Sequence, residues 1–280
     1  MPIPDTSRLT AAPSAWHHLA RRRDLLWQFT VRAVEMKHRG SYLGMIWTVI
    51  NPLLMMGLYL FVFGTIFGGS YHALPDETKL DYAFGLFLGL TFFNVLAETV
   101  SIAPSLIVTN SNLVKKVVFP LEVLPLSQLG ASWFNFLISL SLLLIGAVTF
   151  GRGLAPHGLL WLPVIVLPHL LLTIGLGLFL SALGVFFRDV QHMVQFTAQV
   201  ILYASAVFFS PAIMPPHSWY WLILRWNPFL HTVDLARNAL LWGLPVNPEH
   251  LAYTFVCGAA VCAGGYWFFR KMQPAFADVI

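Results

Sequence analysis

Long apolar stretches, separated by short polar segments, dominate this chain of 280 residues. No Asp, Glu, Lys or Arg lies between Arg39 and Asp76, and five comparable gaps follow, one of them interrupted only by Glu98. A helix that crosses the roughly 30 Å hydrocarbon core of a bilayer needs about 20 mostly apolar residues. The gaps predict six transmembrane helices, at about residues 44–68, 82–104, 121–149, 159–186, 191–213 and 250–269. The runs do not alternate as barrel strands do, so an all-α polytopic membrane protein is expected.

Composition supports this fold class and excludes a soluble globular domain. Hydrophobic residues make up 58% of the chain and charged residues only 10%, against about 25% charged in an ordinary soluble domain. So few charges cannot cover a water-exposed surface of this size. We expect one membrane domain over residues 21–280, preceded by a loose tail over residues 1–20.

The distribution of Lys and Arg predicts the orientation of the helices. With the N-terminus inside, twelve basic residues fall on the inner side and four on the outer side. Loops rich in Lys and Arg stay in the cytoplasm, so both termini are expected there. The net charge of +4 follows from this bias, and no nucleic-acid partner is predicted.

Two amphipathic segments lie outside the predicted spans, one before the first span and one between the fifth and sixth. In residues 21–40, Leu26, Phe29 and Met36 share one helical face, which is typical of a helix lying in the membrane interface. The alternative is a topology anchor without a further role. Residues 211–248 are aromatic yet too polar to span, and they predict re-entrant or gate helices on the periplasmic side between the fifth and sixth spans. An aromatic belt without gating is equally compatible with this segment. Asp234 and Arg237 lie three residues apart on a helical stretch within it, close enough to pair.

The chain carries no recognisable catalytic or metal site. No glycine is followed by lysine, so no nucleotide-binding loop is present and the chain is not expected to hydrolyse ATP. His169 stands alone on a predicted span, where a hydrogen-bonded helix contact is favoured over a metal ligand. Glu98 is the one carboxylate well inside a span; with no basic partner visible, a structural role is favoured over a proton relay.

Two stripes repeat every four residues on predicted spans. Gln191, Gln195, Gln199 and Tyr203 follow one another on the fifth, and Met55, Tyr59, Phe63 and Phe67 on the first. Amides on one helix face either hold helices together or line a wet channel where sugar hydroxyls exchange hydrogen bonds. Aromatic stripes either pack or stack on sugar rings. The residues alone leave both interpretations open.

Four segments together resemble a known family. RDLLWQFTVRAVEMKHRGSYLGMIWTVINPLL at 23–54 resembles the entry segment of ABC-2 type permeases, and NSNLVKKVVFPLEVLP at 110–125 is similar to the first inner loop of their Wzm-type, O-antigen-exporting branch. LGVFFRDV at 183–190 and NPF at 227–229 resemble later landmarks of that branch. The resemblance implies a homodimer in the bacterial inner membrane. It also implies two copies of a separate ATPase that binds ATP and Mg, and a lipid-linked polysaccharide as cargo.

The resemblance also implies roles for particular residues. The channel would be lined by Tyr59, Phe63, Gln195, Gln199 and Tyr203. The residues that couple to the ATPase would be Asn112, Lys115, Lys116, Arg188 and Asp189. The outer gate would contain Trp219, Trp221, Asp234 and Arg237. Alternative cargoes are capsule polysaccharide, teichoic acid or a small amphiphile, and a proton-coupled transporter using Glu98 is a rival class.

Overall fold

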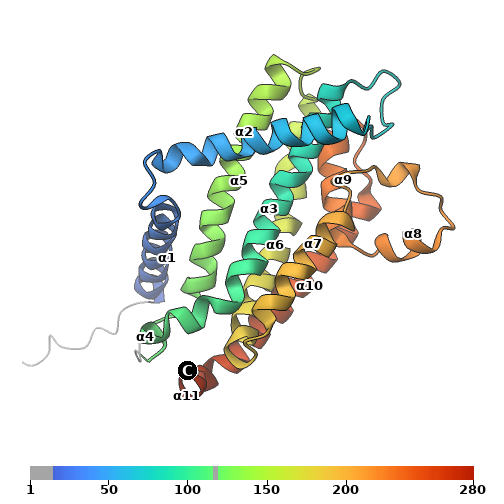
Figure 1. Ribbon diagram of the computed structural model, residues 1–280. Coiled ribbons are helices and arrows are strands. Elements are labelled where there is room, and N and C mark those ends of the chain that lie inside the picture. Colours follow the sequence, from blue (N-terminus) through green and yellow to red (C-terminus); the bar gives the residue numbers. More distant parts are fainter. Residues whose placement is uncertain (1–14, 116–118) are drawn as a thin grey trace, which may run out of the picture.

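A computed structural model describes residues 15–115 and 119–280, with side chains from Arg23 onward except His38, and it is all-helical in this part of the chain (Figure 1). The long helices are α1 (Ala15–His38), α2 (Trp47–Tyr59), α3 (Lys79–Thr109), α5 (Val123–Thr149), α6 (Pro156–Phe186), α7 (Val190–Tyr203), α9 (Pro228–Leu240) and α10 (Pro248–Met272). The short α-helices are α4 (Ser111–Val114), α8 (Trp219–Leu224) and α11 (Phe276–Val279). Single turns of 3₁₀-helix lie at Gly44–Ile46, Pro211–Ile213 and Gln273–Ala275, and a π-helix at Leu60–Ile66 continues α2.

Helix α3 occupies the centre of the bundle. Its side chains are mostly apolar, and most of them are buried against α5, α6, α7 and α9. A helix that is hydrophobic all round is expected to be surrounded in this way. The helix begins at a capping box, in which Thr78 and Asp81 exchange hydrogen bonds between side chain and backbone.

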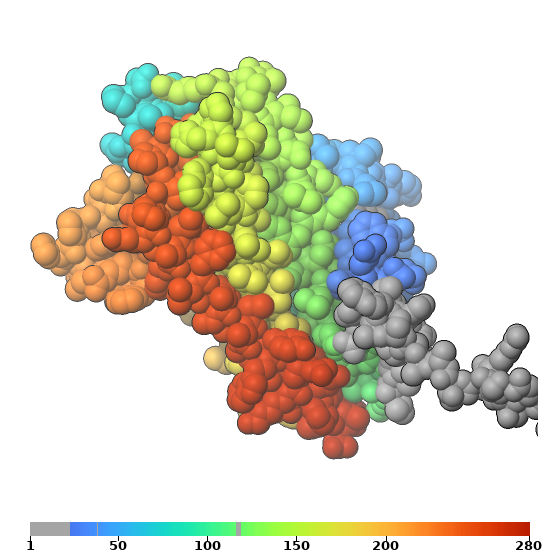
Figure 2. Space-filling view, turned by 180° about the vertical axis from the view of Figure 1, so that it is seen from behind, coloured from blue at the N-terminus to red at the C-terminus, as the bar shows by residue number. Residues whose placement is uncertain are grey.

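The outer helices differ in how closely they pack. Helix α10 lies along α6, and α1 lies beside α5, as the view from behind shows (Figure 2). Helix α2 and its π-helical extension cross the other helices at a steep angle, and few of their residues are buried (Figure 1). The C-terminus and α4 lie at one end of the bundle (Figure 1). That this end faces the cytoplasm stays a prediction.

Five helices in the described residues are long and apolar enough to cross a membrane: Gly44–Ile66, Lys79–Thr109, Val123–Thr149, Pro156–Phe186 and Pro248–Val279. The continuous helix expected over 191–213 is wrong, because α7 ends at Tyr203 and residues 204–210 form turns. At about 1.5 Å per residue, the 14 residues of α7 reach only about 21 Å. Helix α1 begins at Ala15, so the boundary expected at residue 21 falls inside a helix; residues 1–14 of the expected tail lie outside the described part.

Glycines allow α6 and α10 to approach closely. A Cβ atom at Gly265 would overlap the carbonyl oxygen of Gly175, and one at Gly258 would overlap that of Pro168. Small residues at such positions let the backbones of membrane helices touch, so that dispersion contacts stabilise the pair. The neighbouring Gly264 faces open space.

This packing predicts different effects for two adjacent glycines. Gly265→Ala should lower the stability of the purified protein by roughly 1–3 kcal/mol, because α6 and α10 must separate to admit the methyl group. Gly264→Ala should leave stability unchanged or raise it slightly. Thermal unfolding in detergent measures both, and equal melting temperatures for the two variants would contradict the packing.

Candidate functional site

The turn after α7, residues 204–210, is held by side chains from other parts of the bundle. Five of its backbone carbonyls accept hydrogen bonds that a continuous helix would have supplied from its own amides. The donors are Asn227 Nδ2 to Ala204 (2.9 Å), Arg237 Nη1 to Ala206 (2.5 Å), Tyr71 Oη to Val207 (2.5 Å), Tyr82 Oη to Phe208 (3.3 Å) and Arg237 Nη2 to Phe209 (3.3 Å). Each buried carbonyl without a donor would cost several kcal/mol in such an environment.

Arg237 on α9 is the central donor of this turn. Its side chain is fully buried, and Nη2 lies 3.2 Å from Asp234 Oδ1, which confirms the pairing expected from their spacing. The guanidinium also lies over the rings of Tyr71, at 3.8 Å, and Trp242, at 4.9 Å. A buried charge is tolerated only when it is paired and hydrogen-bonded, and aromatic faces add a further attraction. Arg237 therefore joins α9, the turn after α7 and the loop that carries Tyr71.

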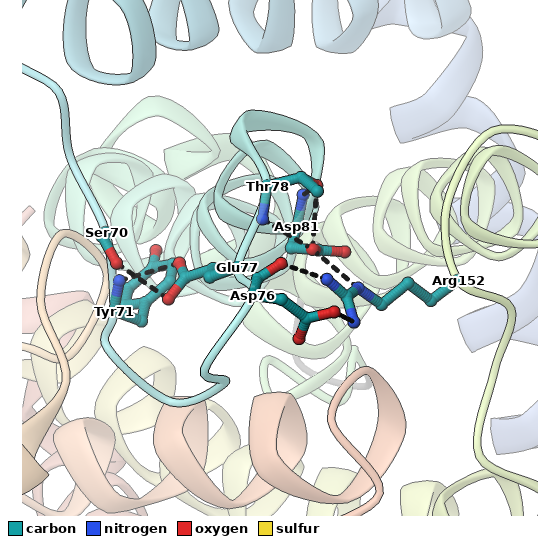
Figure 3. Close-up of polar contacts among 7 residues, drawn as sticks. All are labelled: Ser70, Tyr71, Asp76, Glu77, Thr78, Asp81 and Arg152. Atoms are coloured by element: carbon teal, nitrogen blue, oxygen red, sulfur yellow. Dashed lines mark hydrogen bonds and ion pairs between the residues drawn. The ribbon is translucent and has the colours of Figure 1, made fainter.

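The loop before α3 places Tyr71 for this contact (Figure 3). Arg152 donates from Nε to Asp81 and from Nη1 to Asp76, both at 2.9 Å. The hydrogen bond from Arg152 to Asp76 lowers the pKa of the Asp76 carboxyl. Glu77 accepts a hydrogen bond of 2.8 Å from the backbone amide of Tyr71. Burial raises the pKa of the Tyr71 hydroxyl, which keeps its proton and donates a hydrogen bond to the carbonyl of Val207. These contacts fix the loop on the end of the bundle.

Three of the five expected channel residues meet at Phe208, which lies on neither of the two predicted stripes. The ring of Phe208 lies 4.9 Å from Phe63, 5.7 Å from Tyr203 and 6.3 Å from Tyr59, measured between centroids. Phe208 thereby connects the aromatic stripe of α2 with the end of α7. No periodic pattern could have revealed it, because it lies in the turn and not on a helix face.

The other two expected channel residues, Gln195 and Gln199, lie on the exposed face of α7. The opposite face, with Val194 and Ala198, is buried against α3. Neither glutamine side chain has a hydrogen-bond partner within the described residues. Among the described residues, these two amides therefore do not hold helices together.

The expected coupling residues lie at one end of the bundle. Asn112 and Lys115 are exposed in and just after α4, and Arg188 and Asp189 are exposed in the turn before α7. Both segments lie at the same end as the C-terminus (Figure 1). Lys116, the remaining member of the set, lies outside the described residues. The structure thus presents two exposed turns on one surface.

The four expected gate residues do not form one group. Trp219 is exposed on α8, which projects from the side of the bundle (Figure 1), and Trp221 is half-buried on the same helix. Asp234 and Arg237 lie instead in the bundle interior. Their spacing revealed the pair, but only the packing shows that it secures the turn after α7.

Glu98 has a basic partner, so the expectation that none exists is wrong. Lys37 Nζ on α1 lies 2.9 Å from both carboxylate oxygens. The two residues are far apart in the sequence, which is why no local pattern indicated the pair. His169 is buried with Nε2 3.1 Å from the carbonyl oxygen of Phe92, which confirms a hydrogen-bonded helix contact. The described residues contain no group of three or more His, Cys, Asp or Glu that could hold a metal ion.

Comparison with known proteins identifies the family. Residues 24–241 match the family model of the ABC-2 type transporter. The chain belongs to the ABC-2 type transporter family. The resemblance seen in the four sequence segments is thereby confirmed.

Relatives of this ABC-2 chain are similar over most of its length. An O-antigen export system permease protein RfbA of Klebsiella pneumoniae is 26% identical over 92% of this chain and 95% of its own. The RfbA protein of Myxococcus xanthus is 32% identical over 76% and 78%, respectively. The polysialic acid transport protein KpsM of Escherichia coli is 24% identical over 88% and 92%.

The role of Arg237 predicts a large loss of stability in Arg237→Leu. The change leaves Asp234 without its ion-pair partner and the carbonyls of Ala206 and Phe209 without donors, so stability should fall by roughly 3–5 kcal/mol. Arg225→Leu is the matched control, because Arg225 is exposed and only stacks on Trp226. Thermal unfolding in detergent compares the two, and similar melting temperatures would show that Arg237 does not hold the turn.

Proposed function

We propose that this chain is the membrane-spanning, channel-forming subunit of an ATP-driven exporter of lipid-linked O-antigen-type polysaccharide. The observation that carries the proposal is the similarity to O-antigen export permeases over about nine-tenths of the chain. Two copies of the chain would work in the bacterial inner membrane, with both termini in the cytoplasm. Two copies of a separate ATPase would bind ATP and Mg and supply the energy.

The polar face of α7 and the aromatic cluster around Phe208 support a glycan pathway. Amide groups such as Gln195 and Gln199 both donate and accept hydrogen bonds, as sugar hydroxyls do. The aromatic rings beside them offer flat apolar surfaces on which sugar rings stack. One face of α7 and most of α2 are left unburied in a single copy. A second copy that faces them would complete the walls of the channel.

The exposed turns at Lys115 and Arg188 support the coupling role. Both carry a positive charge on the surface where the ATPase would dock, and both connect directly to helices of the bundle. A movement of the ATPase would therefore reach α3 through α4, and α6 and α7 through the second turn.

Capsule polysaccharide is the second candidate cargo. The similarity to a polysialic acid transport protein supports it, although at lower identity than the O-antigen relative of Myxococcus xanthus. A proton-coupled mechanism is less well supported, because Glu98 has an ion-pair partner in Lys37 that favours a structural role.

Charge reversal of the two turns tests the coupling. Lys115→Glu combined with Arg188→Glu should weaken association with the ATPase by roughly tenfold or more, since two favourable contacts become repulsive. Glycolipid-stimulated ATP hydrolysis of the reconstituted complex should fall with it. Lys79→Glu, an exposed lysine at the opposite end of α3, should behave as wild type. Full stimulation in the double variant would contradict the coupling role.

Removal of the Phe208 ring tests the pathway. Phe208→Ala should reduce glycan export by roughly tenfold, which corresponds to about 1.4 kcal/mol, because the sugar rings would lose a flat apolar surface on which to stack. Phe150→Ala is the control, since Phe150 is exposed at the end of α5. Export into inverted vesicles is the measurement, with ATP hydrolysis recorded in parallel. Unchanged export in Phe208→Ala would exclude this cluster from the pathway.

A further inference from the structure

A cavity of about 370 Å³ lies where the end of α1 and the start of α2 meet the middle of α3 and α5. Cavities of roughly 300–1,000 Å³ are the usual size of small-molecule sites in proteins. This cavity is separate from the turn after α7 and from the glutamine face. None of the residues expected to form the channel, the gate or the coupling surface lines it.

The wall of the cavity is mostly apolar, but a group of polar side chains lines part of it. Three carboxamides, those of Asn51, Asn94 and Asn135, come from three different helices, and the hydroxyls of Ser101 and Ser139 lie among them. Within the described residues, none of these five side chains has a hydrogen-bond partner. Polar groups in a membrane domain are costly unless they are satisfied, so this arrangement favours a hydrogen-bonding occupant.

The charges that border the cavity cancel. Lys37 and Glu98 both line it, and they bind each other through two contacts of 2.9 Å. Its lining contains no other charged residue. An anionic head group such as a phosphate would therefore meet no net positive charge, so a neutral ligand is favoured.

The remaining chemistry fits a sugar. Carboxamides and hydroxyls each donate and accept hydrogen bonds, which matches the alternating requirements of sugar hydroxyl groups. Trp47 and Phe136 add aromatic surface to the wall. Asn51 and Asn94 are exposed, so the cavity is accessible from outside the bundle.

We infer that this cavity binds the neutral, hydroxyl-rich head group of a glycolipid, one or two sugar rings in size. The inference rests on the proposed function only for the source of that head group, which is either the exported glycolipid or a glycolipid of the bilayer. Hydrogen bonds to Asn94, Asn135 and Ser139 would hold the sugar, and the ion pair of Lys37 and Glu98 would keep the site neutral.

Binding to the full-length chain tests the site without the ATPase. The protein is placed in phosphatidylethanolamine nanodiscs with increasing diglucosyl diacylglycerol, and retained lipid is counted by native mass spectrometry. Asn135→Leu and Ser139→Leu should each bind this glycolipid roughly tenfold more weakly, because each replaces a hydrogen-bonding group by an apolar one that fills the cavity. Diacylglycerol without sugar should not bind to the wild-type protein.

The control variant is Ser141→Leu on the same helix. Ser141 is exposed, lies outside the cavity, and donates to the carbonyl of Leu137 in its own helix. It should bind the glycolipid as the wild type does. Melting temperatures ensure that only folded variants are compared. Equal glycolipid binding by all variants, or equal binding of the lipid without sugar, would overturn the inference.

The neutrality of the site has its own test. Glu98→Gln leaves the charge of Lys37 uncompensated, so phosphatidylglycerol should compete with the glycolipid in this variant and not in the wild type. Equal competition in both proteins would overturn the assignment of a neutral ligand.

The source of the head group is distinguished in the complex with the ATPase. If Ser139→Leu lowers the ATP hydrolysis stimulated by a polyprenyl-linked glycan, the cavity receives the exported glycolipid. If stimulation is unchanged while diglucosyl diacylglycerol binding is lost, the ligand is a glycolipid of the bilayer. Because the binding assay needs no transport, failure of the proposed export function would leave its result intact.

Discussion

Backbone carbonyl groups in the interior of a membrane bundle must find donors, and this constraint shapes the region after α7. The helix stops at Tyr203, and the turn that follows takes its hydrogen bonds from Arg237, Tyr71, Tyr82 and Asn227. Those donors belong to three separate segments, which the turn therefore holds together. Glu77 fixes the loop before α3 that carries Tyr71, and the rings of Tyr71 and Trp242 lie against Arg237. These side chains therefore support the same turn.

The bundle divides into a densely packed part and an exposed part. Helices α3, α5, α6 and α9 share the core, and glycines bring α10 into backbone contact with α6. Most of helix α2 and one face of α7, which carries Gln195 and Gln199, are not buried by other described segments. In an exporter built from two copies, such uncovered faces are the natural place for a subunit contact and for cargo.

Several polar groups within the helices are paired by the fold, whereas others are not paired within the described part of the chain. Glu98 is paired with Lys37, Asp234 with Arg237, and His169 Nε2 with a backbone carbonyl. The glutamine stripe on α7 and the amides of the cavity between α2, α3 and α5 are not satisfied by described residues. Since unsatisfied polar groups are costly in lipid, these two places favour contact with hydroxylated ligands or a second copy.

The sequence by itself determined the class of protein and most of its helices, because long apolar runs have few other solutions in a membrane. It also identified the family through four local segments, and the pairing of Asp234 with Arg237 through their helical spacing. Only the tertiary structure decided where α7 ends, that Lys37 pairs with Glu98, and that Phe208 joins the aromatic stripe of α2 to the end of α7. Each of these features depends on residues far apart in the chain, and hydrophobic periodicity records only what neighbouring residues on one helix share.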